Sequence, residues 1–430
     1  MKLLFPQSPR GRAGRDKVLL VVLLLLLLAL VLRATRKPHG VLERNQQFGA
    51  RFLQGKDPYF DPSRGHRIHG PYPPSLSLMA APLSLLPTGT ARVVWAALQG
   101  GTILGLFFLL RGWARRWWPR QAPHAAVFYA GALLLASRYI LRDTAGGGGN
   151  LLYSALAVLG LDLCFRGKEK TAGIPLALGL ALKPNLAPLL LFFAVKRKYR
   201  TLLSALLGAL VLFLLPGLYY GMGSYLHLWS RWVSDVLAYL SLNDLHRAAL
   251  VPDGMPPAKF AMNQCLREAV HRLFRPPGDS GAFDVHLLLL SPAVASWAAR
   301  LLALVLVLLT AWKASRPAGP RTRVLQALAF FPLALLLSPV TWKAHHAALL
   351  PLFFVLLLEG ARRNWRPTWL PAGLVLYYLA CDMASQDILG KAAKNYLQAV
   401  SVVTWFCLAL LGATLYLQGK TGEEITCRGG

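Results

Sequence analysis

Residues 172–200 read AGIPLALGLALKPNLAPLLLFFAVKRKYR. Residues 172–195 are apolar apart from Lys183 and Asn185 near their centre. Basic residues flank this part on both sides, in RGKEK (166–170) before it and in KRKYR (196–200) after it. A proline inside a helix removes a backbone hydrogen bond and breaks the helix, so Pro184 predicts two half-helices that meet at Lys183. Because positive charge marks the cytoplasmic ends of membrane helices, both flanks are expected on the cytoplasmic side, with the break at membrane depth.

The lysine at this break is the most costly residue of the segment. A charged side chain inside a membrane is expensive unless a counter-charge accompanies it. Lys183 is therefore interpreted first as a group that contacts a phosphate. The alternative is a side chain that snorkels, so that its stem is buried and its ammonium reaches the interface.

The composition indicates a membrane protein throughout. Of the 430 residues, 55% are hydrophobic and 15% are charged. Apolar runs recur along most of the chain, each near the roughly 20 residues that span a bilayer, and they leave no room for an ordinary soluble domain. The sequence predicts an all-α polytopic protein with about ten to twelve membrane segments. One membrane domain would cover residues 18–417, between a cytoplasmic N-terminus (1–17) and a cytoplasmic tail (418–430).

Positive charge dominates the sequence. Lys and Arg number 47 and Asp and Glu number 18, so the net charge is 47 − 18 = +29. The basic residues cluster at the ends of apolar runs, which is typical of the positive-inside rule and of contact with anionic membrane lipids, and which argues against nucleic acid as a partner. The first run, Val18 to Leu32, is followed by basic residues without a small-residue cleavage site, which predicts an uncleaved anchor. The five cysteines are scattered and are expected to be small buried residues.

Two long polar loops, at about 35–74 and 221–282, are expected on the outer side. The first contains ERNQQFGARFLQGKDPYFDPSRGHRIHGPYPP, which begins at Glu43 and holds three of the chain's 18 acids, Glu43, Asp57 and Asp61. This loop is interpreted as the source of a catalytic base. The alternative is a solvated loop in which Asp-Pro pairs form turns. In the second loop, residues 229–250 have the spacing of an interfacial amphipathic helix.

Two further polar junctions interrupt the apolar runs. Residues 142–150 read RDTAGGGGN, where glycines allow a close backbone approach or form a flexible turn. Residues 338–346 read SPVTWKAHH and predict the vertex of a second broken helix pair that lines a cavity. Neighbouring residues on a helix point about 100° apart, so His345 and His346 are not expected to face one ligand together, and His346 is preferred as the contact.

Taken together, these motifs resemble glycosyltransferase family 87, a group of GT-C-type membrane mannosyltransferases. The resemblance covers roughly residues 40–415. It rests on GKDPYFD followed by GPYPPSLSLMAAPLSLLP, on GGGGN, on the Lys-Pro segment with its basic exit, on Asn263-Gln264-Cys265, and on SPVTWKAHH. The resemblance implies a GT-C-type helical bundle with interfacial helices in its outer loops.

The same resemblance implies the chemistry. A polyprenyl-phosphate donor would give a sugar, mannose in the family's best example, to a hydroxyl of a glycolipid or glycan on the outer face of the plasma membrane. The lipid phosphate leaves as an anion and needs nearby positive charge, whereas the acceptor hydroxyl needs a base. One base opposite the phosphate gives a single inverting displacement. No cofactor and no obligatory metal are expected, because no Asp-x-Asp motif is present.

The candidate site residues follow from these roles. The family carries an Asp where this chain has Glu43, so three alternatives stand: Glu43 replaces that Asp as the base, Asp57 takes the role, or the chain has departed from the family's chemistry. The donor phosphate would be bound by cationic and imidazole side chains: Lys183, Lys343, His345 and His346. The remaining substrate contacts would come from polar and aromatic residues of the motifs: Asp61, Tyr72, Asn150, Asn185, Asn263, Gln264, Arg267 and Trp342.

Three other functions compete with this interpretation. A transporter or flippase of lipid-linked sugars would also use broken helices and buried cations, but it would depend less on an outer carboxylate, and no internal repeat is visible. A glycan ligase with a diphosphate-linked donor would need a larger outer groove. A non-catalytic scaffold would have no use for polar groups at the helix breaks.

Overall fold

The computed structural model describes residues 40–61, 65–67, 72–240, 262–274 and 285–426, with three isolated positions before them. The predicted anchor over residues 18–32 therefore lies almost wholly outside the described residues. Within the second predicted loop, at 221–282, residues 241–261 and 275–282 lie outside them as well.

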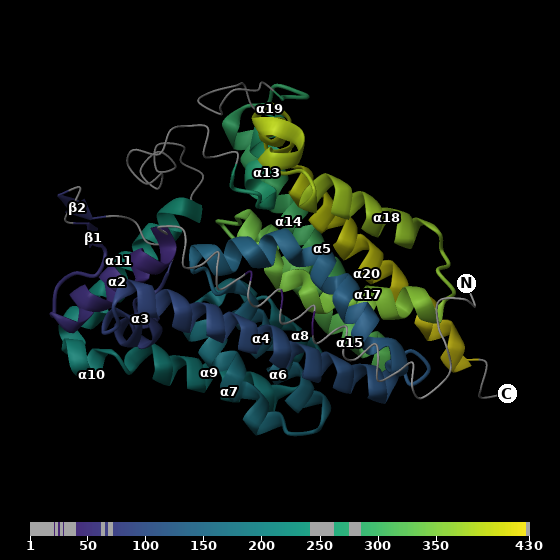
Figure 1. Ribbon diagram of the computed structural model, residues 1–430, viewed down its shortest axis with the longest axis horizontal. Coiled ribbons are helices and arrows are strands. Elements are labelled where there is room, and N and C mark those ends of the chain that lie inside the picture. The colour runs from purple at the N-terminus through teal and green to yellow at the C-terminus, as the bar shows by residue number, and fades with distance from the viewer. Residues whose placement is uncertain are drawn as a thin grey trace.

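Helices make up nearly all of the described structure, which confirms the predicted all-α polytopic class (Figure 1). The bundle is formed, in chain order, by α4 (Thr88–Trp117), α5 (Ala125–Gly146), α6 (Asn150–Phe165), α7 (Glu169–Leu182), α8 (Leu189–Val195), α9 (Tyr199–Leu214), α14 (Pro292–Ser315), α15 (Pro320–Leu328), α16 (Phe330–Leu337), α17 (Leu350–Arg362), α18 (Trp369–Tyr377) and α20 (Val402–Thr426).

Shorter elements fill the junctions of the bundle. The helices among them are α2 (Gly40–Leu53), α3 (Ser77–Ser84), α10 (Gly217–Tyr220), α11 (Met222–Leu240), α13 (Leu266–Phe274) and α19 (Gln386–Ala399). Tight or wide turns of helix are η2 (Pro74–Leu76), η3 (Ala122–His124), η4 (Pro184–Leu186), η6 (Lys343–Leu349) and the π-helix η7 (Tyr378–Asp382). Two short antiparallel strands, β1 (Phe60–Asp61) and β2 (His66–Arg67), pair in the first loop.

Seven described helices are long and apolar enough to span a membrane, and one bent pair would make an eighth. The predicted ten to twelve segments are not reached within the described residues. One reason is that α6 is a shorter apolar helix, and another is that the first apolar run lies outside the described ranges.

The predicted break at Pro184 is confirmed. The chain bends by 118° between helix α7 and the segment from Pro184 to Val195, and Lys183 between them has an extended backbone. The second predicted helix pair, with its vertex at residues 338–346, was expected to be one broken span, and the structure differs from that expectation. Its arms, Pro320–Leu337 and Lys343–Arg362, are each long enough to span by themselves, because the helices extend through polar residues beyond the apolar cores.

Burial separates central helices from peripheral ones. In the candidate span that ends in α17, 83% of the apolar window is buried, whereas the figure for the spans containing α9 and α14 is 28%. Leucines exposed on α9 and α14 suit contact with lipid. The central position of α17 makes η6, which precedes it directly, a rigid element of the core.

At the basic end of the bundle, the buried acids Asp162 and Glu359 form ion pairs. Asp162 accepts a hydrogen bond from Trp113 Nε1 (2.9 Å) and pairs with Arg116 and Arg166. Glu359 likewise accepts from Trp118 Nε1 (2.8 Å) and is held by two arginines of α17 and its C-cap. The carboxylates at this end therefore join helices rather than facing a cavity.

Candidate active site

Three helix junctions that are far apart in sequence meet at Lys183. Its Nζ donates a hydrogen bond to Asn150 Oδ1 (2.8 Å) and lies 3.0 Å from His345 Nε2. The three side chains are buried, with exposed fractions of 5%, 5% and 8% for Lys183, Asn150 and His345. Together with Asp143, which completes the network, they are called the buried lysine cluster below.

Asp143 supplies the carboxylate of this cluster. Its Oδ1 accepts from Asn150 Nδ2 (2.6 Å), and its Oδ2 accepts from the backbone N–H of Leu151 (3.1 Å). The amide of Asn150 thus bridges a buried carboxylate and a buried amine, which is how a membrane protein tolerates charge at depth. No sequence motif pointed to Asp143, although it is one of the few acids at the end of an apolar helix.

Glycines shape the turn that holds Asp143 and Asn150 together. Gly147 and Gly149 have φ of +72° and +69°, a left-handed conformation that glycine adopts without strain. A Cβ on Gly148 would lie 2.3 Å from Asp143 Oδ1, so the backbone at this position closes on the carboxylate. A Cβ on Gly147 would lie 2.6 Å from the Cβ of Leu42, which places α2 against the turn. Of the two interpretations of the glycine run, the close backbone approach therefore describes this turn better than the flexible turn does.

The orientation of His345 is set by its own backbone turn. Its Nδ1 accepts the N–H of Trp342 (3.2 Å), which leaves Nε2 directed at Lys183. Because Nδ1 accepts, the proton of the neutral His345 ring lies on Nε2, so the contact with Lys183 is a hydrogen bond only when the amine of Lys183 is neutral. A protonated Lys183 relies instead on its hydrogen bond to Asn150 and on the carboxylate of Asp143 behind that amide.

Tyr72 covers the amine of Lys183. The Nζ lies 5.1 Å from the ring centroid, within the range of a cation–π interaction. The backbone carbonyl of Tyr72 accepts from Tyr59 Oη (2.8 Å), and Ser75 Oγ donates to Ala181 at the break (2.5 Å). Burial, with a smaller effect of Asp143, raises the pKa of Tyr72 to about 12, so its phenol stays neutral.

The structure divides the four predicted phosphate contacts into two groups. His345 joins Lys183, whereas Lys343 and His346 point elsewhere from η6, because successive residues of a 3₁₀-helix point about 120° apart. His346 packs its ring 5.4 Å from that of Tyr139. The sequence favoured His346 over His345 as the phosphate contact. In the structure, His345 is the histidine that lies beside Lys183.

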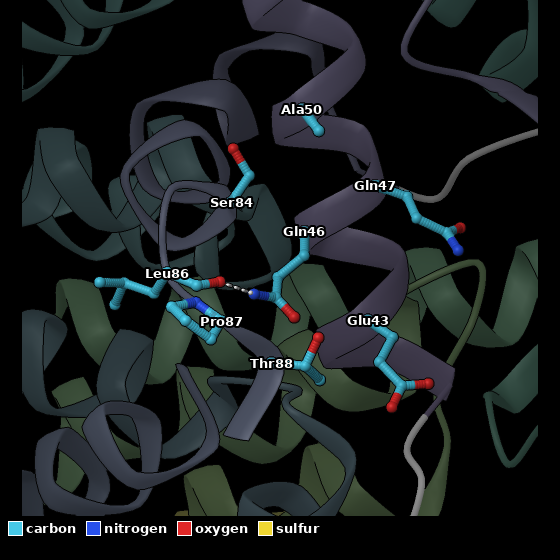
Figure 2. A pocket seen from close by; sticks show the side chains of 8 residues that line it. All are labelled: Glu43, Gln46, Gln47, Ala50, Ser84, Leu86, Pro87 and Thr88. Atoms are coloured by element: carbon cyan, nitrogen blue, oxygen red, sulfur yellow. Dashed lines mark hydrogen bonds between the residues drawn. The ribbon is translucent and has the colours of Figure 1, made fainter. Parts of the chain in front are cut away.

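Glu43 lies on α2 and faces a cavity of about 440 Å³. Its carboxylate is 35% exposed and forms an ion pair with Arg92 of α4. Figure 2 shows Glu43, Gln46 and Gln47 on α2, with the side chain of Gln46 directed at Leu86 of the α3–α4 junction. Gln46 Nε2 donates to the carbonyls of Leu83 and Leu86 (both 3.0 Å) and so joins the two walls.

Asp57, the other predicted base, stabilises a turn. Its Oδ1 accepts the backbone N–H of Tyr59 (2.9 Å), the pattern by which aspartate forms local turns. Arg231 lies 3.8 Å from its other oxygen. These contacts match the alternative interpretation of the first loop, in which the Asp-Pro pairs form turns.

Asn263 and Gln264 hold the backbone that precedes η6. Asn263 Oδ1 accepts from Thr341 N (2.9 Å), and its Nδ2 donates to Pro339 O (3.0 Å). Gln264 Nε2 donates to Gln398 O (3.1 Å). The Asn263 side chain therefore positions the junction that carries His345, whereas the side chain of Gln264 binds α19 and its backbone N–H donates to Thr341 O (2.6 Å).

The other predicted contacts are more scattered. Asn185 is half-buried in η4 next to Lys183, and Trp342 caps η6. Arg267 belongs to α13, and Asp61 lies in β1. Within the described ranges, no three His, Cys, Asp or Glu side chains gather closely enough to hold a metal ion.

Fold and site together define a polytopic membrane protein whose helix breaks converge on a buried cluster of Lys183, Asn150, Asp143 and His345, and in which Glu43 faces a separate polar cavity. The model of glycosyltransferase family 87 matches residues 71–277 and confirms the family that the motifs predicted. The matched stretch includes Asp143, Asn150 and Lys183, whereas Glu43 and His345 lie outside it. No curated protein and no solved structure matches the chain. The family match supports membrane glycosyltransferase activity.

Proposed function

We propose that this glycosyltransferase moves a sugar, mannose in the leading case, from a polyprenyl phosphate to a hydroxyl of a glycolipid or glycan. The reaction would take place on the outer face of the plasma membrane. The observation that carries the proposal is the contact of Lys183 with both Asn150 and His345, because it gathers three polar helix breaks into one site. A scaffold would not need this costly burial of charge.

The reaction is a single displacement at the anomeric carbon of the sugar. The acceptor oxygen bonds to that carbon from one side while the bond to the phosphate oxygen breaks on the other. The electron pair of the broken bond stays on the lipid phosphate, and the acceptor proton passes to a carboxylate. Attack opposite the leaving group inverts the anomeric configuration.

Glu43 is the carboxylate best placed to take this proton. Its side chain is partly exposed to a cavity, whereas the oxygens of Asp143 accept two hydrogen bonds and that side chain is 1% exposed. Asp57 is engaged in its turn. Besides Glu43, the cavity is lined by the amide of Gln47 and the hydroxyls of Ser84 and Thr88, which suit hydrogen bonds to a polyhydroxylated acceptor.

Lys183 would stabilise the departing phosphate from the other side. A positioned cation at a developing negative charge is among the largest contributions to catalysis. A protonated Lys183 would face the phosphate while it is bound, and a neutral Lys183 would accept a hydrogen bond from His345 Nε2 after the phosphate leaves. Tyr72 would shield the amine from water.

The test is sugar transfer in membranes from cells that express the chain. Labelled polyprenyl-phosphate mannose is supplied to wild type, Glu43→Gln and Asp57→Asn, with the amount of each variant measured. The proposal expects transfer by wild type and Asp57→Asn and its loss in Glu43→Gln. Equal transfer by all three would remove Glu43 from the mechanism, and wild-type membranes inactive with every lipid-phosphate sugar would contradict the donor class.

A further inference from the structure

The cavity in front of Glu43 lies between helices whose polar side chains face each other. Glu43 and Gln46 are three residues apart on α2, so they lie on one face of that helix. Thr88 and Arg92 are four residues apart on α4, and Arg92 pairs with Glu43 between the two helices. Glu43, Gln46 and Thr88 all line the cavity. A ligand there would therefore meet side chains that two helices hold in place.

The amide of Gln46 has one orientation that satisfies its surroundings. Its Nε2 carries two hydrogens, and it donates to the carbonyls of Leu83 and Leu86, both at 3.0 Å. The reversed amide would place its oxygen against both carbonyl oxygens, where no hydrogen bond can form. The Oε1 of Gln46 therefore faces away from these carbonyls, and Figure 2 shows it turned toward Thr88.

This amide oxygen is open to a ligand. Among the described residues, no hydrogen bond engages the Oε1 of Gln46, although the side chain is only 9% exposed and lines the cavity. An amide oxygen accepts hydrogen bonds and cannot donate them. A buried polar side chain with an open acceptor usually signifies a ligand or a water that supplies the donor.

Ser84 adds another acceptor to the same cavity. Its hydroxyl donates to the carbonyl of Ala81 (2.8 Å), so its oxygen is left to accept. An ionised carboxylate, such as that of Glu43, also accepts only. Glu43, Gln46 and Ser84 thus surround the cavity with oxygens that call for hydrogen-bond donors. A phosphate dianion offers acceptors and negative charge, whereas the hydroxyls of a sugar ring offer donors.

The spacing of α2 and α3 is fixed close to Gln46. Gly49, one turn further along α2, packs against α3 so closely that a Cβ there would overlap the backbone carbonyl of Ala80. The hydrogen bond from Gln46 to Leu83 joins α2 to the end of the same helix. The acceptor oxygens are therefore positioned before a ligand arrives, which lowers the cost of ordering on binding.

We infer that this cavity is a subsite for an uncharged sugar ring of the acceptor, in which Gln46 Oε1 and Ser84 Oγ each accept a hydrogen bond from a ring hydroxyl that does not react. The inference rests on the proposed function for the role of Glu43, which takes the proton of the reacting hydroxyl. Gln46 and Ser84 then determine specificity, because they select an acceptor with further hydroxyls on the same ring and hold the reacting one at Glu43.

Binding of a defined probe to the purified full-length protein in nanodiscs tests the inference without a sugar donor. The probe is octyl α-mannoside, and each of its analogues lacks one ring hydroxyl. Ligand-observed NMR gives the affinities of wild type, Gln46→Met, Ser84→Ala and the control Gln54→Met. Gln54 is exposed just beyond α2 and does not line the cavity. Thermal unfolding of each variant checks that it is folded.

Wild type should bind two of the analogues about fivefold more weakly than the probe, since each of the two lacks one neutral hydrogen bond to the cavity. Gln46→Met should remove one of these differences, because the oxygen that accepted that hydroxyl is gone. Ser84→Ala should remove the other, and Gln54→Met should keep both. A variant that only loosened the fold would weaken every ligand equally, so both differences retained in a folded Gln46→Met would overturn the inference.

The inference also fails if wild type binds every analogue like the probe, does not bind the probe, or releases it to inorganic phosphate. If Gln46→Met does not fold, Ser84→Ala decides by the same criterion. Because the assay contains no donor, wild type that shows both differences but transfers no sugar would contradict the proposed function and still support this subsite.

Discussion

Lys183 Nζ and His345 Nε2 lie 3.0 Å apart although 162 residues separate them in the chain. The contact joins the break after α7 to the turn η6, and Asn150 links both to Asp143. A buried amine and carboxylate connected through one amide form a unit in which each charge stabilises the other. Removing one of them should therefore affect the partner that remains.

The first prediction concerns this charge pair. Lys183→Met leaves Asp143 buried without its counter-charge and should lower the free energy of unfolding by about 3 to 5 kcal/mol. Asp143→Asn in the same chain should restore much of that loss, because no uncompensated charge remains. Thermal unfolding in detergent of the two single variants and the double variant measures the coupling. Additive losses would show that the residues do not act as a pair.

The second prediction concerns the glycine turn. Gly148→Ala places a Cβ where Asp143 Oδ1 lies, so the carboxylate must move; a loss of about 1 to 3 kcal/mol and reduced transfer are expected. Gly146→Ala is the matched control, because a Cβ there meets nothing within 4 Å. Unfolding and transfer are measured for both variants. Equal behaviour of the two would mean that the turn is not constrained at Gly148.

The third prediction concerns Arg92, which pairs with Glu43. Arg92→Gln should reduce transfer about tenfold, because the carboxylate loses a positioning partner but keeps its chemistry. Glu43→Gln should reduce it by about 10² to 10⁴-fold, the usual contribution of a general base. Rates at saturating donor and acceptor separate the two effects. A larger loss in Arg92→Gln than in Glu43→Gln would assign the main role to the arginine.

The fourth prediction concerns the ring of Tyr72 above Lys183. Tyr72→Phe keeps the ring and should retain transfer within about threefold, because cation–π attraction comes from the ring face. Tyr72→Leu removes about 0.5 to 2 kcal/mol of that attraction and should lower activity further. With its pKa raised to about 12, the phenol should add no alkaline limb to the pH profile below about pH 11. Loss of activity in Tyr72→Phe would instead assign a role to the hydroxyl.

Several features of the fold could be predicted because they depend on local sequence. Apolar length and basic flanks predicted the membrane helices, and the missing N–H of Pro184 predicted the break beside Lys183. The second break was also located, although its arms are longer than the apolar cores alone suggested. The role of Asp143 depends on neighbours from other helices, so no local pattern revealed it.

The sequence by itself therefore determined a bundle of membrane helices with polar residues at its breaks, since span length, charge asymmetry and proline act on the segment that contains them. Only the tertiary structure decided which polar residues meet. It paired Glu43 with Arg92 and brought Asp143 and His345 to Lys183. The physical reason is that a buried charge selects its partner through the packing of whole helices, which brings together groups that chain order keeps apart.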